Sequence, residues 1–174
     1  NEGLALLAEG QHPRAIEPAG LQAGMPVGPL ALSDEVSMSL MMHIREQTKK
    51  DFAAEGRPFP EHPAYRVLDV MVTEQNRSGK AHGAGFYEYP SAGQKHLWPE
   101  LRQLFPLNGF GELPQAEMIE RMMFAQAIET VRCYEEGVLR SVADANIGSI
   151  FGWGFAPFFG GTLQYINAYG LPKF

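Results

Sequence analysis

The stretch between Asp144 and Lys173 contains no charged side chain, and this constrains the fold more than any other feature of the sequence. A membrane-spanning helix needs roughly 20 predominantly apolar residues. Glycines, Pro157, Gln164 and Asn167 interrupt every apolar run of this stretch well before that length. The pattern therefore predicts a bend at which backbones approach closely, followed by a core helix, and no transmembrane segment.

The segment Gly152-Trp153-Gly154 begins like the dinucleotide-binding fingerprint, in which a third glycine follows. Pro157 stands where that glycine is required, and no strand pattern precedes the segment. A phosphate loop is therefore not expected, and we predict no cofactor-binding residue in the chain.

Length and composition exclude several classes of protein. The 174 residues suffice for one or two small domains, and a hydrophobic content of 45% is typical of a globular chain. The net charge is −6 with no basic cluster beyond Lys49-Lys50, so a nucleic-acid partner is not expected. The single Cys133 excludes an internal disulfide and suits a reducing compartment. The chain opens inside an apolar helical pattern without a signal peptide, which predicts a piece of a longer protein.

Helical periodicity and helix-ending residues predict an all-α fold. We expect a helix over residues 1–9, a short helix over 13–17 that ends ahead of Pro18, and a long helix over 114–136. Leu163, Ile166 and Tyr169 predict a further helix after the bend. Residues 86–89 favour a short extended arm at most.

Two segments of the chain resemble each other. In residues 2–19 and 129–145, a glutamate is followed eight residues later by Gly10 or Gly137, then by an arginine, a small residue and a β-branched residue. A Gly-x-Pro or Gly-x-Ala bend follows in both cases. Internal duplication is the favoured interpretation, and chance similarity between two amphipathic helices is the alternative.

Three motifs, taken together, resemble the multifunctional fatty-acid oxidation enzymes, which join an enoyl-CoA hydratase to an NAD-dependent 3-hydroxyacyl-CoA dehydrogenase. Val27, Ala81, His82 and Ala156 are the positions where the chain departs from the usual motifs. In chain order, the motifs are Gly24-Met25-Pro26-Val27-Gly28-Pro29, Gly79-Lys80-Ala81-His82-Gly83-Ala84-Gly85-Phe86-Tyr87-Glu88-Tyr89 and Gly154-Phe155-Ala156-Pro157-Phe158-Phe159-Gly160-Gly161.

The resemblance implies two tandem copies of the all-α C-terminal domain of the dehydrogenase, which is similar to the C-terminal domain of 6-phosphogluconate dehydrogenase. The first copy, truncated at its N-terminus, is expected over residues 1–112. A second, shorter copy is expected over residues 113–174.

The resemblance also implies an activity for the complete protein, the oxidation of 3-hydroxyacyl-CoA to 3-ketoacyl-CoA with NAD. In the family, the nucleotide-binding sheet and the catalytic His–Glu pair precede the region that this chain covers. The chain is therefore expected to be inactive alone and to bind no NAD. The implied partners are acyl-CoA, the upstream nucleotide-binding domain and, as an open alternative, a thiolase subunit, and the implied location is cytoplasmic.

We predict no catalytic residue and no metal ligand in the chain, because no histidine has metal-ligand spacing with a partner. Cys133 is interpreted as inert packing. The histidines are His12, His43, His62, His82 and His96.

A long acyl chain needs an apolar wall, since each buried methylene contributes about 0.8 kcal/mol. The alternative is that residues 26–29 only turn the chain. The predicted substrate-binding residues are Met25, Pro26, Val27, Gly28, Pro29 and Leu32.

Two further expectations concern how the helices associate. Phe155, Phe158 and Phe159 form too much aromatic surface to leave in water, so we expect all three rings to be buried between the repeats. The alternative to an enzyme fragment is a non-catalytic helical dimerisation module.

Overall fold

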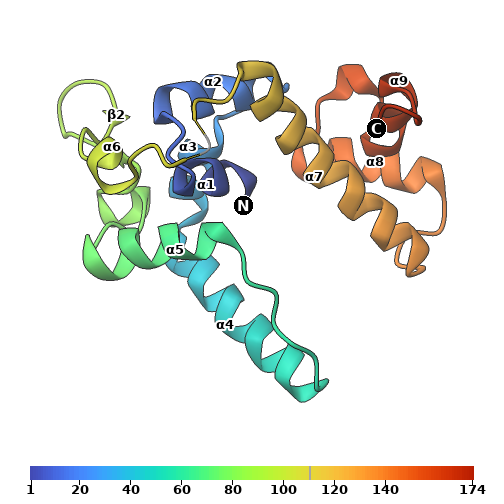
Figure 1. Cartoon of the computed structure of the whole chain (residues 1–174), viewed down its shortest axis with the longest axis horizontal. Helices are drawn as coiled ribbons and strands as arrows, with labels where there is room; N and C mark the ends of the chain where they lie inside the picture. The colour runs from blue at the N-terminus through green and yellow to red at the C-terminus, as the bar shows by residue number, and fades with distance from the viewer. Residues whose placement is uncertain (110) are drawn as a thin grey trace. The chain divides into compact units, whose positions relative to one another are not determined.

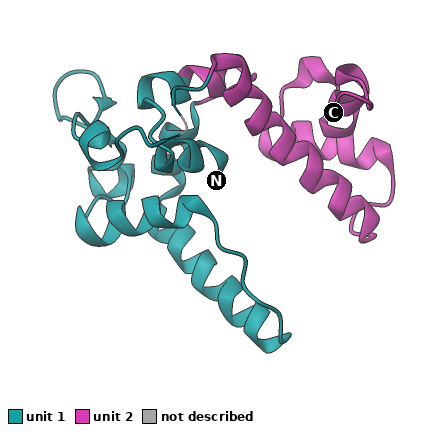
Figure 2. Ribbon diagram, viewed as in Figure 1, with its two compact units in different colours: residues 1–17, 28–113 teal, residues 18–27, 114–174 magenta. Residues whose placement is uncertain are grey.

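The computed structural model describes residues 1–109 and 111–174, and these are predominantly helical (Figure 1). The chain divides into two compact units (Figure 2). Unit 1 comprises Asn1–Glu17 and Gly28–Leu113, and unit 2 comprises Pro18–Val27 and Pro114–Phe174. The second unit therefore includes a segment from near the start of the chain. That the units are tandem copies of one domain stays a prediction.

Short helices make up most of unit 1, and a small antiparallel sheet completes it. In chain order the elements are α1 (Glu2–Ala8), the first part of α2 (Pro13–Gln22), α3 (Pro29–Val36), α4 (Met38–Ala54), α5 (Pro63–Asp69), the π-helical turn η1 (Val70–Glu74), the 3-10 turn η2 (Lys80–His82), β1 (Tyr87–Glu88), β2 (His96–Leu97) and α6 (Leu101–Leu104).

Helix α1 lies at the centre of unit 1 and packs against α3 and α5. It is apolar on nearly every side, so it is buried nearly all round. A β-carbon at Gly3 would lie 2.5 Å from Cβ of Pro29, which shows how closely α1 approaches the start of α3. The predicted helix over residues 1–9 is confirmed. Helix α4 extends away from the other helices of its unit (Figure 1).

The predicted end of the second helix at Glu17 is wrong, because α2 continues through Pro18 to Gln22. Proline lacks the N–H that would bond the carbonyl of Arg14, and a proline inside a helix costs about 3 kcal/mol. Ile16 and Ala19, on either side of Pro18, are fully buried. Packing of this apolar side therefore outweighs the local signal of the proline.

The extended arm expected over residues 86–89 is present as the sheet of β1 and β2. Tyr87 pairs with Leu97 and Glu88 pairs with His96. Arg77 fastens the sheet, since its Nε donates to the Gly85 carbonyl at 2.7 Å and its Nη1 lies 2.9 Å from Oε1 of Glu88. The guanidinium also lies over the ring of Trp98, 4.1 Å from the centroid.

Unit 2 consists of the end of α2, α7 (Gln115–Glu135), α8 (Val142–Trp153), the 3-10 turn η3 (Pro157–Phe159) and α9 (Thr162–Tyr169). Helix α9 packs against both α7 and α8. The predicted helix over 114–136 is confirmed within one residue at each end. The core of the unit is formed by Ala23, Met123, Ala127, Phe155, Tyr165 and Ile166.

The turn from α8 to α9 confirms the predicted bend with closely approaching backbones. Gly161 has φ +106°, and a β-carbon there would lie 2.4 Å from Cα of Asn146 in α8. This approach lets Oδ1 of Asn146 accept hydrogen bonds from the N–H groups of Leu163 and Gln164 at 3.0 and 3.1 Å. Asn146 therefore caps the N-terminus of α9 from a neighbouring helix.

The expectation that three phenylalanine rings would be buried is wrong for Phe158. Phe155 is 2% exposed and lies in the core of unit 2, Phe159 is half-buried, and Phe158 is 69% exposed. The ring of Phe158 lies instead along Gly24, where a β-carbon would be 2.7 Å from its Cε1. Its centroid also lies 4.4 Å from that of the Phe159 ring, and the rest of the ring is exposed. Within the described residues, no helix is both long and apolar enough to cross a membrane.

Candidate functional site

The six predicted wall residues fall on both sides of the boundary between the units, which lies between Val27 and Gly28. In unit 2, Met25 and Val27 are half-buried and Pro26 is exposed. The Met25 N–H donates to the Gly20 carbonyl at 3.1 Å and so closes the end of α2. A β-carbon at Gly154 would be in ordinary contact with the Pro26 ring, at 3.7 Å.

In unit 1, the remaining predicted residues form what we call the wall segment, Gly28–Leu32. Gly28 is buried at the N-cap of α3, and Pro29 occupies the first helical position, where its fixed φ is favourable. Leu32 is 47% exposed, one turn into the helix. An exposed leucine on a proline-initiated helix is suited to contact an apolar ligand, and α3 holds it in place.

Glu17 is the residue that fixes the start of the wall segment, and the sequence did not single it out. Its side chain is only 8% exposed. Oε1 accepts the Leu30 N–H at 2.7 Å, which caps α3, and Oε2 accepts the Tyr87 hydroxyl at 2.6 Å. A β-carbon at Gly28 would lie 2.4 Å from Oε2, so only glycine leaves room for the carboxylate.

A second buried carboxylate, Asp34, holds the later part of α3. Its Oδ1 accepts the Phe86 N–H at 2.8 Å, and its Oδ2 accepts the Tyr87 N–H and the Tyr89 hydroxyl, both at 2.9 Å. A β-carbon at Gly85 would lie 2.0 Å from Oδ1. The glycine-rich motif before β1 is therefore built to receive Asp34.

Burial shifts the pKa values of Asp34 and of the two tyrosines that donate to the buried carboxylates. It raises the pKa of the Asp34 carboxyl, although the hydrogen bonds from Phe86, Tyr87 and Tyr89 act in the opposite direction. Burial, and then the hydrogen bond to Glu17, raises the pKa of the Tyr87 hydroxyl far above its ordinary value. Burial, and then the hydrogen bond to Asp34, likewise raises the pKa of the Tyr89 hydroxyl. Both tyrosines are therefore protonated at neutral pH and donate to the two carboxylates.

Lys80, in the same motif, pairs with Glu35 of α3. Its Nζ lies 2.8 and 2.9 Å from the two carboxylate oxygens, at the surface. An exposed pair of this kind contributes at most about 1 kcal/mol. Its ammonium group therefore already faces a carboxylate from its own unit.

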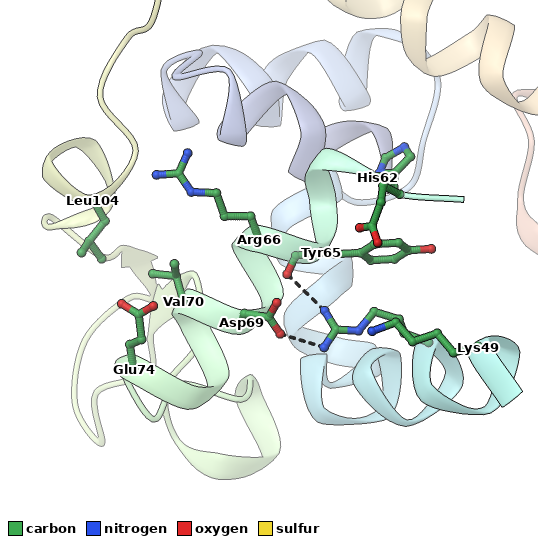
Figure 3. Close-up of a pocket in the computed structure, with 10 residues that line it drawn as sticks. Lys49, His62, Tyr65, Arg66, Asp69, Val70, Glu74 and Leu104 are labelled. Carbon is green, nitrogen blue, oxygen red and sulfur yellow. Dashed lines mark hydrogen bonds and ion pairs between the residues drawn. The ribbon is translucent and has the colours of Figure 1, made fainter. Parts of the chain in front are cut away.

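A cavity of about 510 Å³ is lined by residues of α4, α5, η1 and α6 and of the segment just before α5 (Figure 3). Arg45 is almost fully buried there, with Nη2 2.7 Å from Oδ1 of Asp69 and Nη1 3.4 Å from the Tyr65 carbonyl. His62 accepts the Ala64 N–H and caps α5. Arg66 points to the opposite side of α5 from Lys49 (Figure 3). The lining carries three arginine or lysine side chains and three carboxylates, and the Arg45–Asp69 ion pair joins α4 to α5.

The predicted absence of catalytic residues stays a prediction. Nδ1 of His12 accepts the Arg14 N–H at 3.0 Å, which is a local turn contact. Among the described residues, no group of three His, Cys, Asp or Glu side chains could hold a metal ion. Gly152 and Trp153 lie in the last turn of α8. They follow a helix, whereas the glycines of a dinucleotide fingerprint follow a strand.

Unit 1 is thus a helical domain in which two buried carboxylates, Glu17 and Asp34, hold α3 in place. Residues 1–89, half of the chain, match the family described as 3-hydroxyacyl-CoA dehydrogenase, C-terminal domain. The chain belongs to this family.

Two curated relatives are the fatty acid oxidation complex subunits alpha from two strains of Vibrio cholerae serotype O1, one Classical Ogawa and one El Tor Inaba. The chain is 34% identical to each over 173 residues, which cover 99% of the chain and 23% of each relative. The chain therefore spans about a quarter of the length of these relatives.

Proposed function

We propose that this chain is the C-terminal helical part of an enzyme of fatty-acid β-oxidation that oxidises 3-hydroxyacyl-CoA to 3-ketoacyl-CoA with NAD. The observation that carries the proposal is the similarity along 99% of the chain to subunits named for fatty acid oxidation. The family match over residues 1–89 supports the dehydrogenase step.

The proposed role of this chain is to supply part of the acyl-CoA cleft wall and to hold domains together. In the reaction a hydride leaves C3 of the substrate while a base takes the hydroxyl proton, and NAD accepts the hydride. The exposed Leu32, one turn after the buried Gly28, offers apolar surface to the acyl chain, and Glu17 holds the start of α3.

The proposal extends to the arrangement of the complete protein. Residues 1–112 and 113–174 would be two copies of the family's helical domain, preceded by a nucleotide-binding domain. An enoyl-CoA hydratase region in the same polypeptide, a thiolase partner and a cytoplasmic location belong to the same proposal. The relatives are named as subunits of a complex, which supports an assembly with other chains.

The isolated 174-residue chain is expected to bind no NAD and to oxidise no 3-hydroxyacyl-CoA. The expectation is supported by Gly152 and Gly154 at the end of α8 and Gly160 after η3, because a dinucleotide fingerprint follows a strand. Isothermal titration calorimetry with NAD and an absorbance assay for NADH check this. Micromolar NAD binding by the isolated chain would contradict the proposed division of labour.

Replacing Leu32 with alanine in the full-length enzyme is expected to lower kcat/KM for 3-hydroxydecanoyl-CoA about tenfold, because burying a leucine contributes about 1.5–3 kcal/mol. The value for 3-hydroxybutyryl-CoA should change little, since the shorter chain has few methylenes to bury. Steady-state kinetics with the two substrates measure the difference.

Leu40→Ala is the matched control, because Leu40 in α4 is 47% exposed, as is Leu32. Leu40 and Ile44 are exposed apolar residues one turn apart on α4, and this favours the second candidate function, a helical association module. If neither variant changed turnover while Leu40→Ala weakened self-association in sedimentation experiments, the wall assignment would fail and the association module would be favoured.

A further inference from the structure

We propose that Glu17 and Tyr87 are positioning residues that set where the wall segment stands and thereby tune the use of long-chain substrates. The inference rests on the proposed function, because it assigns a consequence to the acyl-CoA wall. Neither residue needs to touch the substrate. They act through Gly28 and Leu30, whose backbone the Glu17 carboxylate supports.

The Glu17 carboxylate bridges two elements that are distant in sequence. One oxygen bonds the N-terminal turn of α3 through Leu30, and the other bonds the Tyr87 hydroxyl on β1. No ion pair joins Glu17 to a cation among the described residues. The two donors and the N-terminus of α3 stabilise the Glu17 carboxylate. Removing either donor therefore weakens the hold of this carboxylate on α3.

Tyr87 is itself fixed independently of Glu17. Its N–H donates to Asp34, its carbonyl accepts from Arg77 at 3.1 Å, and it pairs with Leu97 in the sheet. The backbone of Tyr87 therefore stays in place when its hydroxyl is removed. The Tyr87 hydroxyl therefore holds Glu17 in place, and Glu17 holds the start of α3.

The close approach at Gly28 transmits any movement of the carboxylate to the wall. A β-carbon there would overlap Oε2 of Glu17, so no side chain separates the carboxylate from the backbone. If Glu17 shifts, the bonded Leu30 and the first turn of α3 shift with it, and Leu32 follows. A displacement of about 1 Å in a binding surface can cost on the order of a hundredfold in turnover.

The test uses Tyr87→Phe in the full-length enzyme, with Tyr89→Phe as the matched control. Both changes remove one hydroxyl from the same motif, but Tyr89 bonds Asp34 rather than Glu17. We expect Tyr87→Phe to lower kcat/KM for 3-hydroxydecanoyl-CoA about fivefold or more, mainly through KM, with less than about a twofold change for 3-hydroxybutyryl-CoA. Tyr89→Phe should change the ratio between the two substrates less than about twofold.

Glu17 variants provide the rescue. Glu17→Gln keeps an oxygen for the Leu30 N–H and an amide that can donate to the Tyr87 oxygen. It should therefore retain most of the substrate ratio, which is kcat/KM for 3-hydroxydecanoyl-CoA divided by kcat/KM for 3-hydroxybutyryl-CoA. Glu17→Ala removes both contacts and should lower the substrate ratio as much as Tyr87→Phe does. Thermal unfolding of every variant is measured alongside, to separate positioning from loss of fold.

Two results would overturn the inference. One is an unchanged substrate ratio in Tyr87→Phe, and the other is an equal fall in the ratio for Tyr87→Phe and Tyr89→Phe. If Leu32→Ala lowers long-chain turnover while Tyr87→Phe does not, only the positioning role fails. If Leu32→Ala itself has no effect on either substrate, the proposed wall fails.

Discussion

Phe155→Ala is expected to lower the free energy of unfolding of unit 2 by about 3–5 kcal/mol, as for other large aromatic truncations in a core. Phe155 is 2% exposed, and its ring lies 6.3 Å from that of Tyr165 and 6.5 Å from that of Phe159, measured between centroids. Truncation leaves a cavity beside Met123 and Ala127 that the surrounding helices cannot fully close.

The control for this prediction is Phe158→Ala in the same turn. Phe158 is 69% exposed, so its truncation should cost about 1 kcal/mol or less. Trp98 in unit 1 and Trp153 in unit 2 are the two tryptophans of the chain, so a Trp98→Phe background reports on unit 2 alone. Urea unfolding followed by fluorescence gives the comparison, and equal losses for the two variants would contradict the assigned burial.

Asp34→Ala is expected to destabilise unit 1 by more than about 3 kcal/mol. The change leaves the N–H groups of Phe86 and Tyr87 and the hydroxyl of Tyr89 without their acceptor. Each buried donor left unpaired costs about 1–3 kcal/mol. The wild-type interaction is strong although burial raises the pKa of Asp34, because all three donors converge on one carboxylate.

The neighbouring Glu35→Ala change separates this effect from a general loss of charge on α3. Glu35 pairs with Lys80 at the surface, so its removal should cost less than about 1 kcal/mol. Trp98 is the reporter here, since its backbone N–H donates to the Phe86 carbonyl at 2.9 Å. A Trp153→Phe background isolates its signal, and a loss below about 1 kcal/mol for Asp34→Ala would show that the motif is held by other contacts.

Local signals in the sequence predicted much of the helical architecture. Helix α7 was predicted within one residue at each end, because Pro114 and Gly137 mark the ends of an uninterrupted apolar period. The helix end predicted at Pro18 was wrong. The free-energy cost of a proline inside a helix is outweighed by the burial of Ile16 and Ala19, which only the folded chain reveals. Phe158 misled in the other direction, because hydrophobicity does not say which side of a turn faces the core.

The candidate site was predictable only in part, for a physical reason. The bend at Gly28-Pro29 is a local feature and can be found in the sequence. The support of that bend is not local, because the hydrogen bond from Tyr87 to Glu17 joins residues that no periodicity connects. A buried glutamate also looks like any surface glutamate until its partners are known.

The inclusion of Pro18–Val27 in unit 2 has a consequence for how the chain folds during synthesis. Unit 1 has all its segments once Leu113 has left the ribosome, so its contacts can form while the remainder is still being made. The core of unit 2 needs Ala23 together with Met123 and Tyr165, which emerge much later. The end of α2 therefore cannot pack until its apolar partners have been synthesised. Because the chain between Ala23 and Met123 must close as a long loop, we expect unit 2 to fold more slowly than unit 1.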